Sequence, residues 1–248
     1  MPRLELSRSR KASIEKTEEY YNALRTNIQL SGDNLKIIAL TSVQPNEGKS
    51  TTSINLAIAF ARAGYKTILI DADIRNSVMS GVFKSKEKIT GLTDYLAGKT
   101  DLSQGLCETD VENLFVIESG QTSPNPTALL QGKNFDSMMN VLRKYYDYVI
   151  VDTPPIGLVI DAAIIAQKCD ASILVTEAGA VKRKLVQKAK EQLEQTDTPF
   201  LGVILNKYNV AMDKYGSYGI YGAYGNYGNY GTRSEEHTSE LQSHYRIS

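Results

Sequence analysis

Short apolar runs alternate with longer amphipathic stretches along most of the chain. The short runs predict buried strands, at residues 37–40, 67–70, 114–117, 148–151, 172–175 and 201–205. The amphipathic stretches predict helices, at residues 17–30, 54–62, 91–96, 127–142, 161–168 and 182–195. Strands that alternate with helices predict an α/β fold, in which helices cover both faces of a mainly parallel sheet.

Both ends of the chain fall outside this alternation. Residues 1–16 are polar and basic, which predicts a flexible basic arm ahead of a folded domain at residues 17–213. From residue 214 a tyrosine followed by glycine recurs at every third position, at Tyr215, Tyr218, Tyr221, Tyr224, Tyr227 and Tyr230. A segment of this composition offers too few aliphatic side chains for a core. Residues 214–232 are therefore predicted to be a disordered tail.

Residues 233–248 are expected to be non-native. From Arg233 to His244 they match, residue for residue, the translation of a common sequencing-adapter DNA. We therefore expect a read-through product that takes no part in the fold. Both histidines of the chain, His237 and His244, lie in this segment. The remaining residues thus exclude catalysis or metal binding by histidine.

The charge balance and the hydropathy narrow the class of protein. The chain has 28 basic and 28 acidic residues, and this formal net charge of zero predicts no nucleic-acid partner. No apolar run approaches the roughly 20 residues that span a bilayer. We therefore expect a cytoplasmic protein that reaches a membrane only through another protein. Cys107 and Cys169 lack the spacing of metal ligands and are expected to be buried in a reducing compartment.

A candidate phosphate-binding loop lies between the first central strand and its helix. Gly48-Lys49-Ser50 falls where backbone N–H groups at a helix start can bind phosphate oxygens. Lys49 would reach the β- and γ-phosphates, and the Ser50 hydroxyl would hold Mg²⁺. The predicted phosphate-binding residues are Pro45, Asn46, Glu47, Gly48, Lys49, Ser50 and Thr51. Val43 stands where the common motif has its first glycine, so a chance Gly-Lys-Ser at a helix start is the competing interpretation.

Carboxylates follow two other predicted strands. Asp71 and Asp73 come after residues 67–70, and Asp152 comes after residues 148–151. The carboxyl ends of parallel strands share one edge of a sheet, so these groups can meet the phosphate loop. A divalent cation would offset their crowded charge, and one carboxylate could accept a proton from a hydroxyl. Arg75 could neutralise phosphate charge or pair with these aspartates. The competing interpretations are a solvated turn and a strand cap.

Together these motifs resemble those of the bacterial tyrosine kinases. The matching segments are Ser42-x-x-Pro45-x-Glu47-Gly48-Lys49-Ser50, Ile68-Leu-Ile-Asp71-x-Asp73-x-Arg75 and Val149-Ile-Val-Asp152-Thr-Pro-Pro155. The resemblance extends from about residue 5 to 231, includes the tyrosine cluster, and is nearest to the streptococcal kinases of capsular polysaccharide synthesis. It implies a P-loop NTPase-type fold and transfer of phosphate from ATP, with Mg²⁺, to the tail tyrosines of a neighbouring subunit.

The resemblance also assigns residues to roles. Lys49, Ser50 and Thr51 take the Walker A roles, and Asp152 takes the Walker B role. Asp71 and Asp73 take the Walker A′ roles, with the base not chosen between them. The catalytic set is then Lys49, Asp71, Asp73 and Arg75, and the Mg²⁺ ligands are Ser50, Asp71 and Asp152.

The resemblance has further implications for adenine binding and for the partners. Asn206 could contact adenine, or could simply belong to a turn. The family assembles as a ring-like homo-oligomer through a helix with the motif Glu-x-x-Arg-x-x-Arg. This chain keeps Glu19 and Arg25 of that motif but has Asn22 in place of the first arginine. A transmembrane adaptor of the polysaccharide co-polymerase type and a cognate tyrosine phosphatase are the other implied partners. The implied place is the inner face of the membrane, and the implied role is the control of capsule synthesis and export.

Two other classes of protein compete with a kinase. A switch ATPase of the MinD/ParA type would carry a second lysine early in the phosphate loop, whereas residues 42–47 contain none. A non-catalytic adaptor, phosphorylated by another kinase, would not need the set formed by Lys49, Asp71, Asp73 and Asp152. Phosphotyrosine formation by the purified protein separates all three.

Overall fold

The computed structural model describes residues 1–85, 87, 89–208 and 242–246. Within this part of the chain one ten-stranded sheet has the order β10-β9-β8-β2-β7-β3-β6-β5-β1-β4. The strands are β1 (Arg3–Leu6), β2 (Ile37–Ser42), β3 (Thr67–Asp71), β4 (Phe83–Lys84), β5 (Leu106–Thr109), β6 (Leu114–Ile117), β7 (Tyr148–Asp152), β8 (Ala171–Glu177), β9 (Phe200–Tyr208) and β10 (Gln242–Arg246).

The centre of the sheet is parallel, as the apolar runs predict. The contiguous strands β9, β8, β2, β7, β3 and β6 are the six predicted ones, and each pairs in parallel with its neighbour. The outer strands are mixed, because β5 is antiparallel to β6, β4 to β1 and β10 to β9, while β1 is parallel to β5. The mainly parallel α/β fold is thus confirmed.

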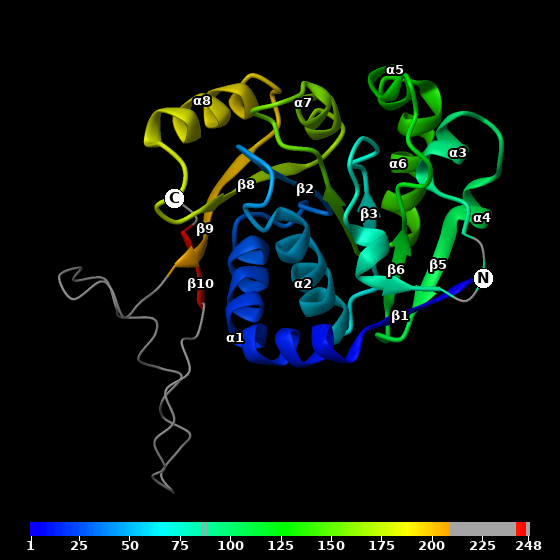
Figure 1. The fold of residues 1–248 in the computed structure, drawn as a ribbon, viewed down its shortest axis with the longest axis horizontal. Coiled ribbons are helices and arrows are strands. Elements are labelled where there is room, and N and C mark those ends of the chain that lie inside the picture. The colour runs from blue at the N-terminus through cyan, green and yellow to red at the C-terminus, as the bar shows by residue number, and fades with distance from the viewer. Residues whose placement is uncertain (86, 88, 209–241, 247–248) are drawn as a thin grey trace, which may run out of the picture.

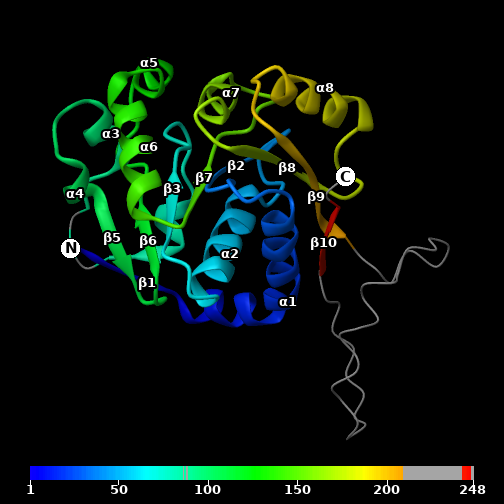
Figure 2. The same ribbon diagram turned by 180° about the vertical axis from the view of Figure 1, so that it is seen from behind.

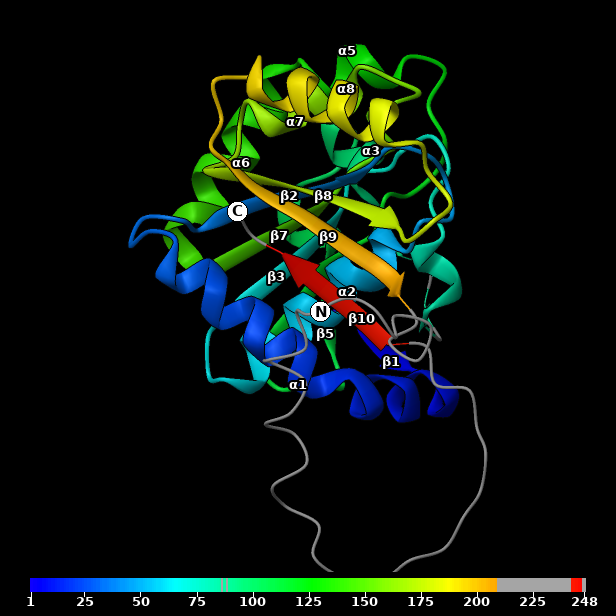
Figure 3. The same cartoon turned by 90° about the vertical axis from the view of Figure 1, so that its left-hand side faces the viewer.

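Helices cover both faces of the sheet (Figure 3). One face is covered by α1 (Arg8–Leu30) and α2 (Lys49–Arg62), which share a core with β2, β3 and β7. The helices α3 (Leu92–Leu96), α5 (Pro126–Leu130), α6 (Lys133–Tyr145), α7 (Asp161–Ala166) and α8 (Arg183–Glu194) cover the other. The short α4 (Leu102–Gly105) and the 3₁₀ turn η1 (Met79–Gly81) complete the elements. Figure 2 shows α3, α5 and α6 over the β6 side, with α7 and α8 over β8 and β9.

The N-terminal segment is ordered, contrary to the prediction of a flexible arm at residues 1–16. β1 pairs with β4 and β5, and Ser7 caps α1 by accepting a hydrogen bond from Arg10 N. Leu4, Leu6 and Ile14 are buried, which provides the apolar contact that holds the segment. Thr17, the predicted N-cap, lies inside the helix, where its hydroxyl donates to the carbonyls of Ser13 and Ile14. Such bonds favour a bend, and α1 turns from beneath the sheet to stand beside α2 (Figure 1).

The predicted helix at residues 127–142 is two helices. Gly132, in an extended conformation with φ −74° and ψ 156°, is the N-cap of α6 and separates it from α5. Pro126 occupies the first turn of α5, where its missing N–H costs nothing. The break matters for the site, because it brings Thr127 of α5 against α7.

The C-terminal predictions have different outcomes. The tyrosine tail at residues 214–232 lies outside the described residues. The expectation that residues 233–248 stay out of the fold is wrong for residues 242–246, which form β10 against β9. An edge strand offers unpaired backbone groups to any extended segment, so this pairing needs no particular sequence. The foreign origin of the segment stays a prediction. Among the described residues, no helix is long and apolar enough to span a bilayer.

Candidate active site

The loop between β2 and α2 has the shape of an anion site. Gly48 is the N-cap of α2 with φ +91°, in the left-handed region that favours glycine. Asn46 also has a positive φ, +66°, which asparagine tolerates better than most residues. The first turn of α2 therefore opens on the loop with its backbone N–H groups free of intrahelical partners. Val43, at the position of the missing glycine, is buried and packs in the core with Ile156.

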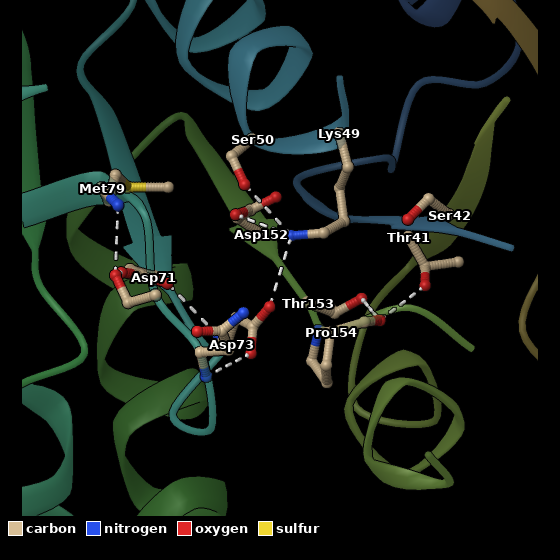
Figure 4. Close-up of polar contacts among 12 residues, drawn as sticks. Thr41, Ser42, Lys49, Ser50, Asp71, Asp73, Met79, Asp152, Thr153 and Pro154 are labelled. Atoms are coloured by element: carbon tan, nitrogen blue, oxygen red, sulfur yellow. Dashed lines mark hydrogen bonds and ion pairs between the residues drawn. The ribbon is translucent and has the colours of Figure 1, made fainter. Parts of the chain in front are cut away.

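Side-chain hydrogen bonds fix the ends of β2 and β7 against each other (Figure 4). Thr41 Oγ1 donates to the Pro154 carbonyl at 2.8 Å and accepts from Ile156 N at 3.1 Å. Thr153 Oγ1 donates in the other direction, to the Leu40 carbonyl at 2.9 Å. The strand that carries the phosphate loop is thereby held to the strand that carries Asp152.

Lys49 lies among the carboxylates that the sequence predicts to surround it (Figure 4). Its Nζ is 3.0 Å from Asp152 Oδ2, 3.8 Å from Asp73 Oδ2 and 3.2 Å from Ser50 Oγ. The Lys49 side chain is only 8% exposed, so these contacts are shielded from water. Ser53, which the sequence analysis does not single out, donates to Asp152 Oδ1 at 2.9 Å. Both oxygens of Asp152 therefore have a partner.

Asp71 is a buried carboxyl with a strongly perturbed pKa. The pKa of Asp71 is raised from 3.8 to about 7, mainly by burial and next by the charge of Asp152, its register partner on β7. Ser77 Oγ donates to Asp71 Oδ2, and this bond lowers the pKa. Asp73 N approaches Asp71 Oδ1 at 3.3 Å. A carboxyl that titrates near neutral pH suits proton transfer from a hydroxyl.

The acidic groups fit a magnesium ion by chemistry. Ser50, Asp71 and Asp152 offer only oxygen donors, which Mg²⁺ prefers, and Mg²⁺ commonly takes one or two carboxylates together with substrate phosphates. The described residues contain no group of three or more acidic, histidine or cysteine side chains already gathered as a metal cage. Lys49 occupies the space beside Asp152 instead.

Arg75 is paired with an aspartate outside the predicted set. Its Nε is 2.6 Å from Asp161 Oδ2 and its Nη2 is 3.2 Å from Asp161 Oδ1 and 3.0 Å from Thr127 Oγ1. Hydrogen bonding to Asp161, whose side chain is fully buried, raises the pKa of Arg75. The aspartate that Arg75 contacts is therefore one that sequence reasoning missed. A catalytic role for Arg75 stays a prediction.

The remaining predicted site residues lie on the phosphate loop, at the end of β9 and on α1. Pro45 and Asn46 are exposed at the tip of the loop, and Thr51 lies in the first turn of α2. Glu47 is buried and Asn206, at the end of β9, donates to the Glu47 carbonyl at 2.9 Å. Glu19 is exposed on α1, and Arg25 donates to Gln29 on the same helix.

Comparison with known proteins decides the class. An AAA domain family matches residues 35–196. The tyrosine-protein kinase CpsD of Streptococcus pneumoniae is 68% identical over 216 residues, which cover 87% of this chain and 95% of that protein. The chain belongs to the bacterial tyrosine kinase family. It is a protein-tyrosine kinase with a nucleotide-binding P-loop domain.

Solved structures separate this bacterial tyrosine kinase from the switch ATPases. The kinase domain of the Escherichia coli tyrosine kinase ETK is 33% identical, with a TM-score of 0.71, covering 76% of this chain and 74% of that one. The septum site-determining protein MinD of Pyrococcus horikoshii, solved with Mg-ADP, is 26% identical with a TM-score of 0.59, covering 70% of each chain. The MinD-like alternative is thus a more distant relation in fold.

Proposed function

We propose that this kinase transfers the γ-phosphoryl group of Mg-ATP to the tyrosines of its own C-terminal cluster, from one subunit to another. The observation that carries the proposal is the convergence of Lys49, Asp71, Asp73 and Asp152 beside the N-terminus of α2. The acceptors are Tyr215, Tyr218, Tyr221, Tyr224, Tyr227 and Tyr230. Each acceptor is followed by glycine, which has no side chain to obstruct a neighbouring site.

Phosphate binding falls to the loop and the first turn of α2. Backbone N–H groups from Gly48 onward would bind the phosphates, and Lys49 would move from Asp152 to the β- and γ-phosphate oxygens. Ser50 and Asp152 would hold Mg²⁺, which neutralises charge on the transferring phosphate and orients it. The loss of the Lys49–Asp152 contact would be offset, because a phosphate would take the place of Asp152 beside Lys49 and a metal ion the place of Lys49 beside Asp152.

Proton transfer is assigned to the carboxylates at the end of β3 and just beyond it. Asp71 would accept the proton of the incoming tyrosine hydroxyl, because its pKa near 7 leaves it partly ionised and able to hold a proton at neutral pH. Asp73 is 7% exposed, and its Oδ1 accepts a hydrogen bond from Asn76 N at 3.1 Å. It would help to position Lys49 beside the phosphates. Asp71 is therefore proposed as the base in preference to Asp73. Its role is then more than the binding of a metal ion.

We further propose the cellular setting that the family resemblance implies. The cytoplasmic end of a transmembrane adaptor of the polysaccharide co-polymerase type would activate the kinase at the inner face of the membrane. A tyrosine phosphatase would reverse the reaction, and capsule synthesis and export would respond. Glu19, which is exposed, and Arg25, which is partly buried, would join neighbouring subunits into a ring through α1. Charge attraction between them would be weakened by salt.

The test is phosphotyrosine formation by the purified full chain with Mg-ATP and an adaptor's cytoplasmic peptide. Lys49→Met is the matched inactive control, because methionine keeps the length and apolar stem of lysine. Mass spectrometry should find phosphate on the tail tyrosines of the unmodified protein and none with Lys49→Met. ATP hydrolysis without phosphotyrosine would contradict the proposal and favour the switch ATPase.

A further inference from the structure

Glu47 fastens the phosphate loop to the end of β8. Its carboxylate is 3% exposed and accepts three hydrogen bonds. Oε2 accepts from Gln44 N at 2.5 Å, and Oε1 accepts from Thr176 Oγ1 at 2.8 Å and from Glu177 N at 3.2 Å. A buried carboxylate with this many donors is a fixed anchor rather than a free ligand.

A second set of contacts reaches the same loop from the end of β9. Asn206 Nδ2 donates to the Glu47 carbonyl at 2.9 Å, and Lys207 Nζ donates to the Asn46 carbonyl at 2.9 Å. Lys207 is also paired with Glu177 Oε2 at 2.7 Å. Two successive carbonyls of the loop are therefore bound by two successive side chains of one strand.

These contacts set the direction of the loop N–H groups. The described residues have no cis peptide bond, so the N–H of each trans peptide points opposite to its carbonyl. Because the carbonyls of Asn46 and Glu47 point to Lys207 and Asn206, the N–H groups of Glu47 and Gly48 point away from β9. An anion site of this kind needs aligned N–H groups.

Gly48 shows how closely Asn206 covers the loop. A Cβ at Gly48 would lie 1.9 Å from Asn206 Nδ2, far inside any permitted contact. The amide of Asn206 thus lies on the backbone of the loop at the residue that begins α2. One N–H of its Nδ2 is bound to the loop carbonyl, and this bond ties the side chain to the loop whatever its second N–H and its Oδ1 contact.

We propose that Asn206 and Lys207, with Glu47, Thr176 and Glu177, form a loop clamp that holds the phosphate loop ready before nucleotide binds. The proposal rests on the nucleotide-binding function of the loop. Asn206 is then a positioning residue for the phosphates rather than a reader of the base. The clamp lowers the ordering cost of binding, so its effect should be equal for ligands with and without adenine.

The test compares Asn206→Ala and Lys207→Met with the unmodified full chain. The dissociation constants of ATP, GTP and inorganic triphosphate are measured by calorimetry with Mg²⁺. Each variant should weaken all three ligands by a similar factor, about tenfold for the loss of one well-placed hydrogen bond. The KM for ATP should rise by that factor, with kcat changed by less than about twofold, because Lys49 and Asp71 are untouched.

Controls keep the outcomes distinct. Lys190→Met removes an ion-paired lysine of similar exposure on α8, with Nζ 3.5 Å from Glu194 Oε1, and should leave every constant unchanged. Thermal unfolding of each variant checks the fold. Weaker ATP binding with unchanged triphosphate binding in Asn206→Ala would overturn the clamp and assign Asn206 to adenine. Unchanged binding of all ligands would also overturn it. An unmodified chain that binds ATP but forms no phosphotyrosine would instead sink the kinase mechanism alone.

Discussion

Replacing Asp71 by asparagine should stabilise the fold while removing the base. The pKa of Asp71 is about 7 in the folded chain, against 3.8 for an unperturbed carboxyl, a difference of about 3 units. Each unit corresponds to about 1.36 kcal/mol, so ionised Asp71 costs the fold about 4 kcal/mol. The folded chain binds more protons than the unfolded chain between about pH 4 and pH 7. Stability is therefore lost as the pH rises through that window.

Asparagine resembles the protonated carboxyl in size and can still accept from Ser77, but it never ionises. Asp71→Asn should raise the free energy of unfolding by roughly 4 kcal/mol at pH 8 and by less than half of that at pH 5. Urea unfolding at both pH values measures the difference. Asp136→Asn is the control, because Asp136 is 45% exposed, and it should show no such gain. An Asp71→Asn chain that is no more stable than the unmodified one at pH 8 would mean that ionised Asp71 does not destabilise the fold.

Two further substitutions test the same centre. Ser77→Ala removes the hydrogen bond that lowers the pKa of Asp71, so the rising limb of kcat/KM against pH should move up by about one unit; an unmoved limb would mean that Asp71 is not the titrating group. Arg75→Met leaves the buried Asp161 carboxylate with Thr127 alone, and urea unfolding should show a loss of about 2 kcal/mol, less than a fully buried pair because Arg75 is 38% exposed. The double variant Arg75→Met, Asp161→Asn should regain part of the lost stability, because it has no unpaired buried charge. If Arg75→Met lowers kcat and leaves the stability unchanged, Arg75 instead neutralises charge on the phosphate.

Much of the site could be predicted because it follows from topology. Parallel strands bring their carboxyl ends to one edge, so the loop after β2 and the aspartates at the ends of β3 and β7 had to meet there. Apolar runs of four or five residues were enough to locate those strands. The residue types then indicated phosphate and metal chemistry without any knowledge of distances.

The remainder depends on contacts between distant parts of the chain. Nothing local links Arg75 to Asp161, which is 86 residues further along, or Glu47 to Thr176. Ser77 could have been noticed only as a hydroxyl a few residues after Asp71. The strand β1 is visible in the sequence, because Leu4 and Leu6 alternate with Arg3 and Glu5, as in a half-buried strand. The basic composition of residues 1–16 favours a flexible arm instead, and the two indications conflict.

Transfer from the P-loop site of one subunit to the tyrosine cluster of a neighbour can be tested by mixing two chains. One carries Lys49→Met and an intact tail, and the other has an intact site and all six tail tyrosines changed to phenylalanine. With Mg-ATP and the adaptor peptide, phosphotyrosine should appear on the Lys49→Met chain only in the mixture. A Lys49→Met chain that stays unlabelled in the mixture, while the unmodified protein is labelled, would contradict transfer between subunits.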